Sequence, residues 1–259
     1  MAGFLVTFVG LPGTGKSTLV ARVLETLRER GIRCDASDEV AFRKLKNKLA
    51  WAVREACAHP RFAWRSLKAI LASRQRSLMD LVKMVANWFA RSFLIRRAAR
   101  CPGIHLFDED MFQAFWSIVF SARADGWHDG LPLPGTLLPV PSLVIVLESN
   151  LPTIERRLAA RPGCSSRLEQ WLPTDPGVLK RADRLMEDVR ETIARTAREH
   201  AGMHVLLIDS DQDDFLEANA LRVADYILAL SADQGMRVPS GDCMCRSCRA
   251  ESVTIAVHS

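Results

Sequence analysis

The stretch Gly10–Thr18 reads GLPGTGKST and satisfies every fixed position of the phosphate-binding loop (P-loop) pattern G-x-x-x-x-G-K-[ST]. An apolar run precedes it, FLVTFV at 4–9, which is typical of a buried strand. Apolar residues recur at helical spacing after it, from Leu19 to Leu27, and Gly31 ends that helix. Strand, glycine-rich loop and helix therefore follow one another in the order that a P-loop requires.

The residues of this loop indicate how it binds a nucleoside triphosphate. Its glycines let the backbone close around a phosphate with N–H groups pointing inward, and the following helix N-terminus adds positive charge. Lys16 is expected to reach the β and γ phosphates, and the Ser17 hydroxyl to ligate Mg²⁺. We therefore expect ATP and Mg²⁺ as cofactors, with nucleotide contacts from Gly10, Pro12, Gly13, Thr14, Gly15, Lys16, Ser17 and Thr18.

Composition places the chain among globular proteins with one large core. Of its 259 residues 48% are hydrophobic and 25% are charged, which suits a single α/β domain. The sequence has no apolar stretch of roughly eighteen residues and no signal-peptide pattern, so we expect a cytoplasmic protein. Its seven cysteines are then expected to be reduced thiols rather than a disulfide framework.

Short apolar runs alternate with helical patterns along the chain. The runs after the first lie at 32–38, 104–107, 143–147 and 204–209. This alternation predicts an α/β fold with a parallel sheet covered by helices on both faces. We expect one P-loop domain over residues 1–232 and a Cys-containing tail over 233–259.

The segment 41–100, between the second and third predicted strands, is strongly basic. It holds 15 of the 35 Lys and Arg residues but only 2 of the 30 Asp and Glu residues, Glu55 and Asp80. Its apolar periodicity predicts a long helical hairpin that breaks at His59-Pro60, and the polar stretch 73–77 is a further place for an interruption. Such a block suggests an anionic partner: nucleic acid, a membrane surface or a phosphate-rich substrate. A solvated face that pairs with acids elsewhere explains it equally well.

Two carboxylates, Asp108 and Glu109, directly follow the apolar run 104–107. A carboxylate at a strand end can hold Mg²⁺ or accept a proton from an attacking hydroxyl. We expect Asp108 to ligate the metal together with Ser17 and to act as the catalytic carboxylate, with Glu109 assisting it. The alternative is an acid that only caps the next helix.

Four arginines follow the fourth predicted strand: Arg156, Arg157, Arg161 and Arg167. Phosphoryl transfer needs cations over the transferred group, and a planar guanidinium suits this task. We expect Arg161 and Arg167 to act in catalysis, because the polar segment 161–173 between and after them suits a mobile lid. An ordinary solvated helix face is the alternative.

With these residues in place, the sequence resembles the P-loop nucleoside and nucleotide kinases, most of all the thymidylate kinase group. The shared features are the N-terminal P-loop, Asp108 before an aromatic helix, the Arg-rich helix, and the lid-like SRLE at 166–169. The resemblance covers about residues 3–230. It implies a sheet with strand order 2-3-1-4-5 and phosphoryl transfer from ATP.

The sequence departs from that family on the acceptor side. Asp108-Glu109 stands where thymidylate kinases carry Asp-Arg, and DASD at 35–38 replaces their Arg-Glu-Pro type segment. The resemblance therefore implies donor binding, but not thymidylate as the acceptor. We expect a small anionic acceptor, with substrate-binding residues Asp38, Arg74, Arg156 and Arg157.

Several alternatives stay open. The chain could be a non-kinase P-loop ATPase that binds nucleic acid or an acidic membrane through 41–100, or a polynucleotide 5′-kinase or sugar-nucleotide kinase. A homodimer is also left open. Cys243, Cys245 and Cys248 with His258 could hold zinc, but C-x-C-x-x-C fits no common zinc module and a mobile tail is favoured.

Overall fold

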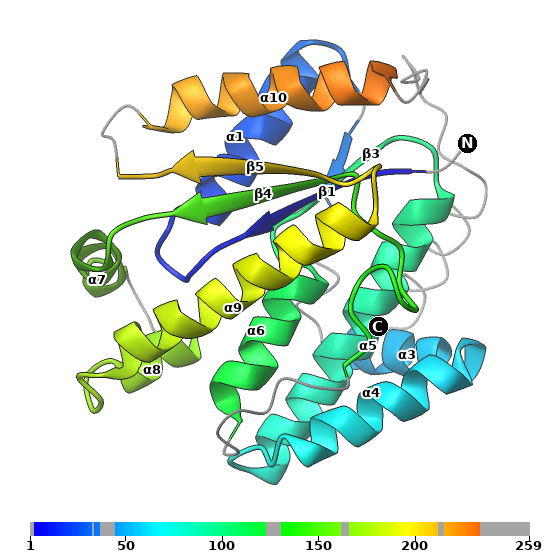
Figure 1. Cartoon of the computed structure of the whole chain (residues 1–259), viewed down its shortest axis with the longest axis vertical. Coiled ribbons are helices and arrows are strands. Elements are labelled where there is room, and N and C mark those ends of the chain that lie inside the picture. Colours follow the sequence, from blue (N-terminus) through cyan, green and yellow to red (C-terminus); the bar gives the residue numbers. More distant parts are fainter. Residues whose placement is uncertain are drawn as a thin grey trace, which may run out of the picture.

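A five-stranded parallel sheet forms the centre of the computed structural model, with strand order β2-β3-β1-β4-β5 (Figure 1). The structure describes residues 3–32, 34–36, 45–122, 131–161, 166–211 and 215–233. The strands span Phe4–Val9 (β1), Cys34–Ala36 (β2), Ile104–Phe107 (β3), Leu143–Glu148 (β4) and His204–Asp209 (β5). The expected fold class and strand order are confirmed.

The strand register determines which loops meet at one edge of the sheet. Thr7 of β1 lies beside Phe107 of β3 on one side and Val144 of β4 on the other. Since all three strands run in the same direction, the chain leaves β1 at Val9 and β3 at Phe107 next to each other. The P-loop and Asp108 therefore lie at the same carboxyl edge, where open α/β sheets bind their ligands.

Helices cover both faces of the sheet (Figure 1). The two faces carry separate buried clusters, because alternate residues of each strand point to opposite sides. One cluster packs against α1 and α10, and the other against α5, α6 and α9. The helices span Lys16–Glu29 (α1), Leu45–Ala58 (α3), Pro60–Ala72 (α4), Leu78–Arg100 (α5), Met111–Ser121 (α6), Leu151–Ala159 (α7), Arg167–Trp171 (α8), Val178–Glu199 (α9) and Phe215–Asp233 (α10).

The described part of the basic segment, 45–100, forms three helices rather than the two-helix hairpin expected from the sequence. Pro60 stands at the first turn of α4, after the break at His59, where a missing N–H costs nothing. The polar stretch 73–77 then ends α4 and starts α5. Ser77 is the N-cap of α5, and its hydroxyl accepts a hydrogen bond from the Asp80 backbone N–H at 3.0 Å. This cap competes with continuation of the helix, so the chain turns between α4 and α5 instead of running through 73–77 as one bent helix.

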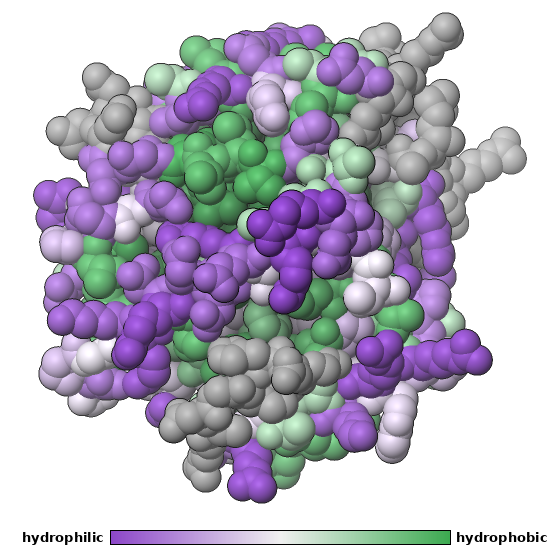
Figure 2. Space-filling model, viewed as in Figure 1, coloured by the Kyte–Doolittle hydropathy of each residue, from purple (hydrophilic) through white to green (hydrophobic). Residues whose placement is uncertain are grey.

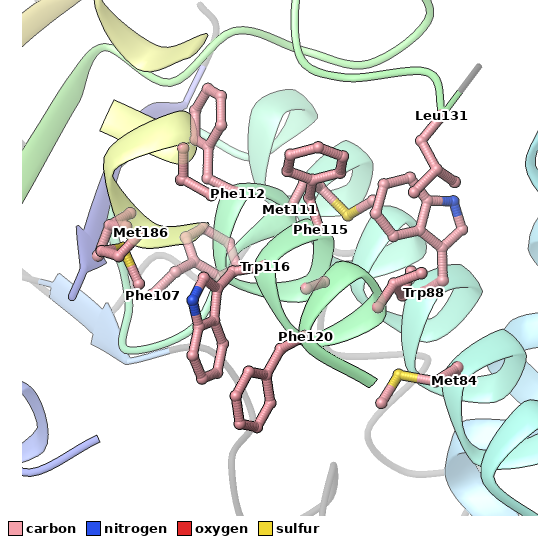
Figure 3. Close-up of a cluster of buried hydrophobic side chains, with 14 of the residues drawn as sticks. Met84, Trp88, Phe107, Met111, Phe112, Phe115, Trp116, Phe120, Leu131 and Met186 are labelled. Carbon is pink, nitrogen blue, oxygen red and sulfur yellow. The ribbon is translucent and has the colours of Figure 1, made fainter. Parts of the chain in front are cut away.

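The helix α6 is buried on almost every side and joins the sheet to the basic segment. Figure 3 shows Phe112, Phe115 and Trp116 of α6 among side chains from neighbouring helices, including Met84 and Trp88 of α5. The Trp116 indole donates a hydrogen bond to the Ala182 carbonyl of α9 at 3.1 Å, so its polar atom is satisfied. This packing fixes α6, and with it the residues that follow β3, relative to the sheet.

The edge strand β5 is only partly covered. Val205 and Leu207 are 36% and 58% exposed and lie on the sheet face that α9 covers over β4. Figure 2 shows a green area in the upper half of the view, over β5 and the adjoining side of α10. No helix in the described part of the chain is long and apolar enough to cross a membrane.

A buried ion pair holds the three helices of the basic segment together. Arg96 of α5 donates to Glu55 of α3 at 2.7 Å, and the Glu55 side chain is only 2% exposed. The same guanidinium lies over the Phe62 ring of α4, 5.3 Å from its centroid, and donates to the Leu137 carbonyl. One cation therefore contacts α3, α4 and the segment before β4.

Replacing Arg96 with Met should lower the free energy of unfolding by about 3–5 kcal/mol, because Glu55 would stay buried without its counter-ion. Replacing Glu55 with Leu at the same time should recover most of that loss. The exposed interhelical pair of Arg30 with Asp225 gives a matched control, since Asp225→Ala should cost less than about 1 kcal/mol. Urea unfolding monitored by circular dichroism measures all three variants. If Arg96→Met lowers the free energy of unfolding by less than Asp225→Ala does, the Arg96–Glu55 pair does not stabilise the fold.

Candidate functional site

The P-loop has the backbone conformation that its glycines allow. Gly13 and Gly15 have φ angles of 93° and 89°, which side chains larger than a hydrogen strongly disfavour. A Cβ on Gly10 would lie 2.8 Å from the Leu147 carbonyl oxygen of the next strand. Thr14 is buried, and its hydroxyl donates to the Leu11 carbonyl at 2.9 Å. Thr14 therefore shapes the loop with its side chain, and only its backbone is left for a phosphate.

Lys16 is the first residue of α1 and folds back over the loop. Its ammonium group donates to the carbonyls of Gly10 at 2.5 Å and Leu11 at 2.9 Å. Burial of this group lowers the pKa of Lys16 to about 8, while the neighbouring carboxylates of Asp108 and Glu109 partly offset the effect. The lysine thus stands at the loop and keeps its charge near neutral pH.

Ser17 and Asp108 meet as the strand register requires. The Ser17 hydroxyl donates to one Asp108 carboxylate oxygen at 2.7 Å. The other oxygen, Oδ1, is buried without a hydrogen-bond partner among the described residues. A hydroxyl and a carboxylate beside a phosphate loop are the hard oxygen ligands that Mg²⁺ prefers. Because Oδ1 of Asp108 is buried and has no hydrogen-bond partner in the described part of the chain, it is available to coordinate the ion. The residues therefore fit a Mg²⁺ ion held with the nucleotide.

Glu109, the next residue, is not hydrogen-bonded to Ser17 but forms an ion pair with Arg91 of α5. The Arg91 guanidinium lowers the pKa of Glu109, against the opposing effect of burial, and also donates to the Glu109 backbone carbonyl at 2.5 Å. The Glu109 side chain is still 54% exposed. It is thus an ionised carboxylate with an accessible edge.

Asp110 is structural and links α6 to the P-loop. As the N-cap of α6 it accepts a hydrogen bond from the Gln113 backbone N–H at 2.9 Å, and burial raises the pKa of Asp110 to about 6. The Gln113 side-chain oxygen in turn accepts from the Gly10 backbone N–H at 3.3 Å. The first residue of the loop is therefore tied to the helix that follows Asp108.

Two adjoining cavities open at this edge of the sheet. The first, of about 620 Å³, has the P-loop on one side and will be called the phosphate cavity. The second, of about 520 Å³, lies between α5, α6 and α8 and will be called the acceptor cavity. Residues that line both are Pro12, Lys48, Asn87, Arg91, Glu109, Gln113 and Ser166. Ser17 and Asp108 line only the phosphate cavity, whereas Glu109 lies where the two cavities join.

The two arginines expected to act in catalysis line different cavities. Arg161 lines the phosphate cavity and pairs with Glu169 at 3.1 Å. Arg167 lines the acceptor cavity, where it pairs with Asp80 at 2.9 Å and donates to the Ser121 hydroxyl at 3.0 Å. The segment after Ser166 is the short helix α8, closed by a capping box in which Ser166 and Glu169 bond each other's backbone.

Three of the predicted substrate-binding residues, Arg74, Arg156 and Arg157, line neither cavity. Arg74 lies at the corner between α4 and α5 with a φ of 49° and is exposed. Arg156 is exposed on α7, and Arg157 donates to the Ser210 carbonyl after β5 at 2.7 Å. Asp38 and the cysteine cluster at 243–248 with His258 lie outside the described residues.

Sequence reasoning missed four polar residues that line both cavities: Lys48, Asn87, Arg91 and Gln113. Lys48 donates to the Asn87 side-chain oxygen at 2.8 Å, which joins α3 to α5 inside the cavity wall. Gln113 carried a usable signal, since it is the one amide side chain in the first turn of a helix made mostly of apolar and aromatic residues. Lys48 and Arg91 come from the basic segment, where cations are too common to single out one of them, and Asn87 is a neutral residue of the same segment with no motif around it.

No family model and no curated protein matches this sequence. Solved structures do match its fold. A deoxyadenosine kinase from M. mycoides with bound products superposes with a TM-score of 0.52 at 12% identity, covering 88% of this chain and 100% of that one. A thymidylate kinase from Candida albicans gives a TM-score of 0.51 at 13% identity, covering 88% of this chain and 94% of that one. At such low identity these likenesses establish the architecture alone: the chain has the fold of the P-loop nucleotide kinases.

Proposed function

We propose that this protein is an ATP-dependent phosphotransferase that acts on a small anionic acceptor. The observation that carries the proposal is the contact of Ser17 with Asp108 at the mouth of a P-loop, beside a second cavity. A P-loop ATPase needs the contact of Ser17 with Asp108, but a kinase also needs a second cavity that holds its acceptor. The likeness to deoxyadenosine kinase and thymidylate kinase folds supports the same assignment.

The donor half of the mechanism uses the phosphate cavity. Backbone N–H groups of Gly13–Thr18 receive the phosphates, and Lys16 exchanges its two carbonyl partners for phosphate oxygens. Ser17 and Asp108 would hold Mg²⁺, which neutralises charge on the β and γ phosphates when bound. Arg161 is the cation of the lid segment on this cavity, so it is suited to stabilise the transferred group.

The acceptor half uses the acceptor cavity, whose charge favours an anion. Four cations line it, Lys48, Lys83, Arg91 and Arg167, against two carboxylates, Asp80 and Glu109. Four cations against two carboxylates, each of which has an arginine partner, give the cavity wall a net positive charge. Aromatic side chains, among them Trp116 and Phe120, form a flat apolar wall opposite these groups.

We propose a division of roles between the two strand-end carboxylates that differs from the sequence expectation. Asp108 is engaged by Ser17 and faces the phosphates only, which suits a metal ligand. Glu109 lines both cavities, so it is the group that can accept a proton from an acceptor hydroxyl as the phosphoryl group arrives. We therefore assign the general base to Glu109 and the metal to Asp108.

A panel of nucleosides, nucleotides and sugar phosphates, assayed for ADP release with ATP and Mg²⁺, tests the proposal directly. Each active compound should give a new phosphorylated product by ³¹P NMR in equal amount to ADP. ATP hydrolysis that no compound diverts into a phosphorylated product would instead favour the non-kinase ATPase.

The lowered pKa of Lys16 predicts pH-dependent nucleotide affinity. In the empty protein Lys16 loses its proton near pH 8, whereas bound phosphates favour the ammonium form. Above that pH Lys16 must therefore take up a proton from the buffer as the nucleotide binds, and affinity should fall by up to about tenfold per pH unit. An arginine at this position stays protonated, so Lys16→Arg should make nucleotide affinity independent of pH from about 7.5 to about 9.5, the range over which the wild-type lysine titrates.

Isothermal titration calorimetry in buffers of different ionisation enthalpy measures the proton uptake. A flat affinity profile in the wild-type chain would contradict the position of Lys16. Lys16→Ala should lose nucleotide binding while its circular dichroism spectrum stays unchanged.

The two carboxylate variants should fail in different ways. Asp108→Asn should raise the Mg²⁺ concentration needed for half-maximal turnover, because it removes a charged ligand. Glu109→Gln should lower kcat about 100-fold, as for a lost general base, with the Mg²⁺ requirement unchanged. Steady-state kinetics over a Mg²⁺ series separate the two. Glu148→Gln, at the end of β4 and on neither cavity wall, is the matched control and should change neither parameter.

The arginine variants should separate the two substrates. Arg161→Ala should lower kcat about tenfold or more with little change in the KM for the acceptor. Arg167→Ala should mainly raise the acceptor KM, since its guanidinium lines the acceptor cavity. Arg156→Ala, exposed on α7, should behave as wild type. Equal effects of Arg161→Ala and Arg167→Ala on both parameters would argue against separate roles.

A further inference from the structure

A basic and apolar surface lies on α4 and the start of α5, outside both substrate sites. It will be called the α4–α5 surface. On α4 the exposed positions recur at helical spacing and are Arg61, Trp64, Arg65, Lys68, Leu71 and Ala72. The corner and the first turns of α5 add Arg74, Leu78, Met79, Val82 and Lys83. Figure 2 shows purple side chains beside pale and green ones at the lower right, over α4.

The apolar members of this surface are unusually exposed. Trp64 is 69% exposed, Leu71 51%, Leu78 77% and Met79 63%. Together with Val82 they make up five of the ten exposed large apolar side chains in the described part of the chain. Exposed apolar side chains scattered singly over a surface need no explanation, but five of them within nineteen positions (64–82) indicate a surface that contacts a partner.

The charged members are all cations. Residues 45–83 contain two acids: Glu55 is buried on Arg96, and Asp80, with a side chain 29% exposed, pairs with Arg167. Within the described residues, no carboxylate forms an ion pair with Arg61, Arg65, Lys68 or Arg74. The alternative that the basic face is neutralised by acids of the same fold therefore does not hold for these four.

We propose that the α4–α5 surface docks the protein onto an anionic phospholipid bilayer. The cations would contact lipid headgroups, Trp64 would lie at the headgroup level, and the aliphatic side chains would enter the acyl boundary. Nucleic acid satisfies the cations but leaves Leu71, Leu78 and Met79 in water, because aliphatic groups neither stack on bases nor bond phosphates. A second copy of the same surface would bring like charges together.

Docking would also set the acceptor cavity beside the bilayer. Lys83 belongs to the surface and lines the acceptor cavity, and Asp80, one turn earlier on α5, lines it too. The docking proposal rests on exposure and charge alone, so it stands whether or not the proposed phosphotransferase activity is found.

Vesicle co-sedimentation of the full chain tests the proposal, with vesicles of neutral phosphatidylcholine and of phosphatidylcholine containing phosphatidylglycerol. Binding should require the anionic lipid and weaken with added salt. Arg65→Glu with Lys68→Glu should reduce the partition constant by tenfold or more, since each cation near such a surface contributes about fivefold. Lys180→Glu with Arg184→Glu, an exposed pair on α9 with the same charge change, is the matched control and should bind nearly as wild type.

The apolar part is tested separately. Leu78→Ser should weaken vesicle binding, whereas Leu207→Ser on the exposed face of β5 should not. Tryptophan fluorescence should shift to shorter wavelength on vesicle binding in the wild type, and the shift should be largely lost in Trp64→Phe.

Three results would overturn the proposal: no sedimentation with anionic vesicles, equal losses in the α9 control, or no effect of Leu78→Ser. Fluorescence anisotropy with single-stranded and duplex oligonucleotides covers the competing partner. Tight oligonucleotide binding that Arg65→Glu with Lys68→Glu abolishes, without vesicle binding, would assign the surface to nucleic acid instead.

Discussion

The parallel pairing of β1 with β3 is the constraint on which the site depends. It pairs Phe107, the last residue of β3, with Thr7 near the end of β1, so both strands end at the same edge of the sheet and Ser17 and Asp108, ninety-one positions apart, come within one hydrogen bond. Neither strand could shift by one residue without turning its buried side chains to the opposite face. The two apolar clusters therefore support this register, and the register brings the P-loop and Asp108 together at the proposed nucleotide site.

Sequence reasoning reached the parts of this protein that local chemistry determines. The P-loop is a contiguous motif, the strands are continuous apolar runs, and their alternation with helices restricts the sheet to few arrangements. The position of Asp108 followed because strand ends in a parallel sheet share an edge. These inferences needed no knowledge of which helix packs on which.

The acceptor side could not be predicted in the same way, because its residues come together only through helix packing. Lys48, Asn87 and Arg91 lie on two helices of the basic segment, and their cavity exists because α3 packs along α5. Conversely, Arg74 and Arg157 looked equally suited to a substrate but lie elsewhere, one at a helix corner and one against the chain after β5. In a segment so rich in cations, charge identifies the kind of partner and packing decides which side chains meet it.

The hydrogen bond from Gly10 to Gln113 has a further consequence for how the two substrates are bound. It joins the first residue of the donor loop to α6, a helix whose later turns, at Trp116 and Phe120, form a wall of the acceptor cavity. An acceptor that displaces α6 therefore alters the loop, and the resulting coupling free energy must be reciprocal. In the phosphotransferase that we propose, whatever factor the acceptor contributes to nucleotide affinity, the nucleotide contributes equally to acceptor affinity, so this contact would couple the binding of the two substrates.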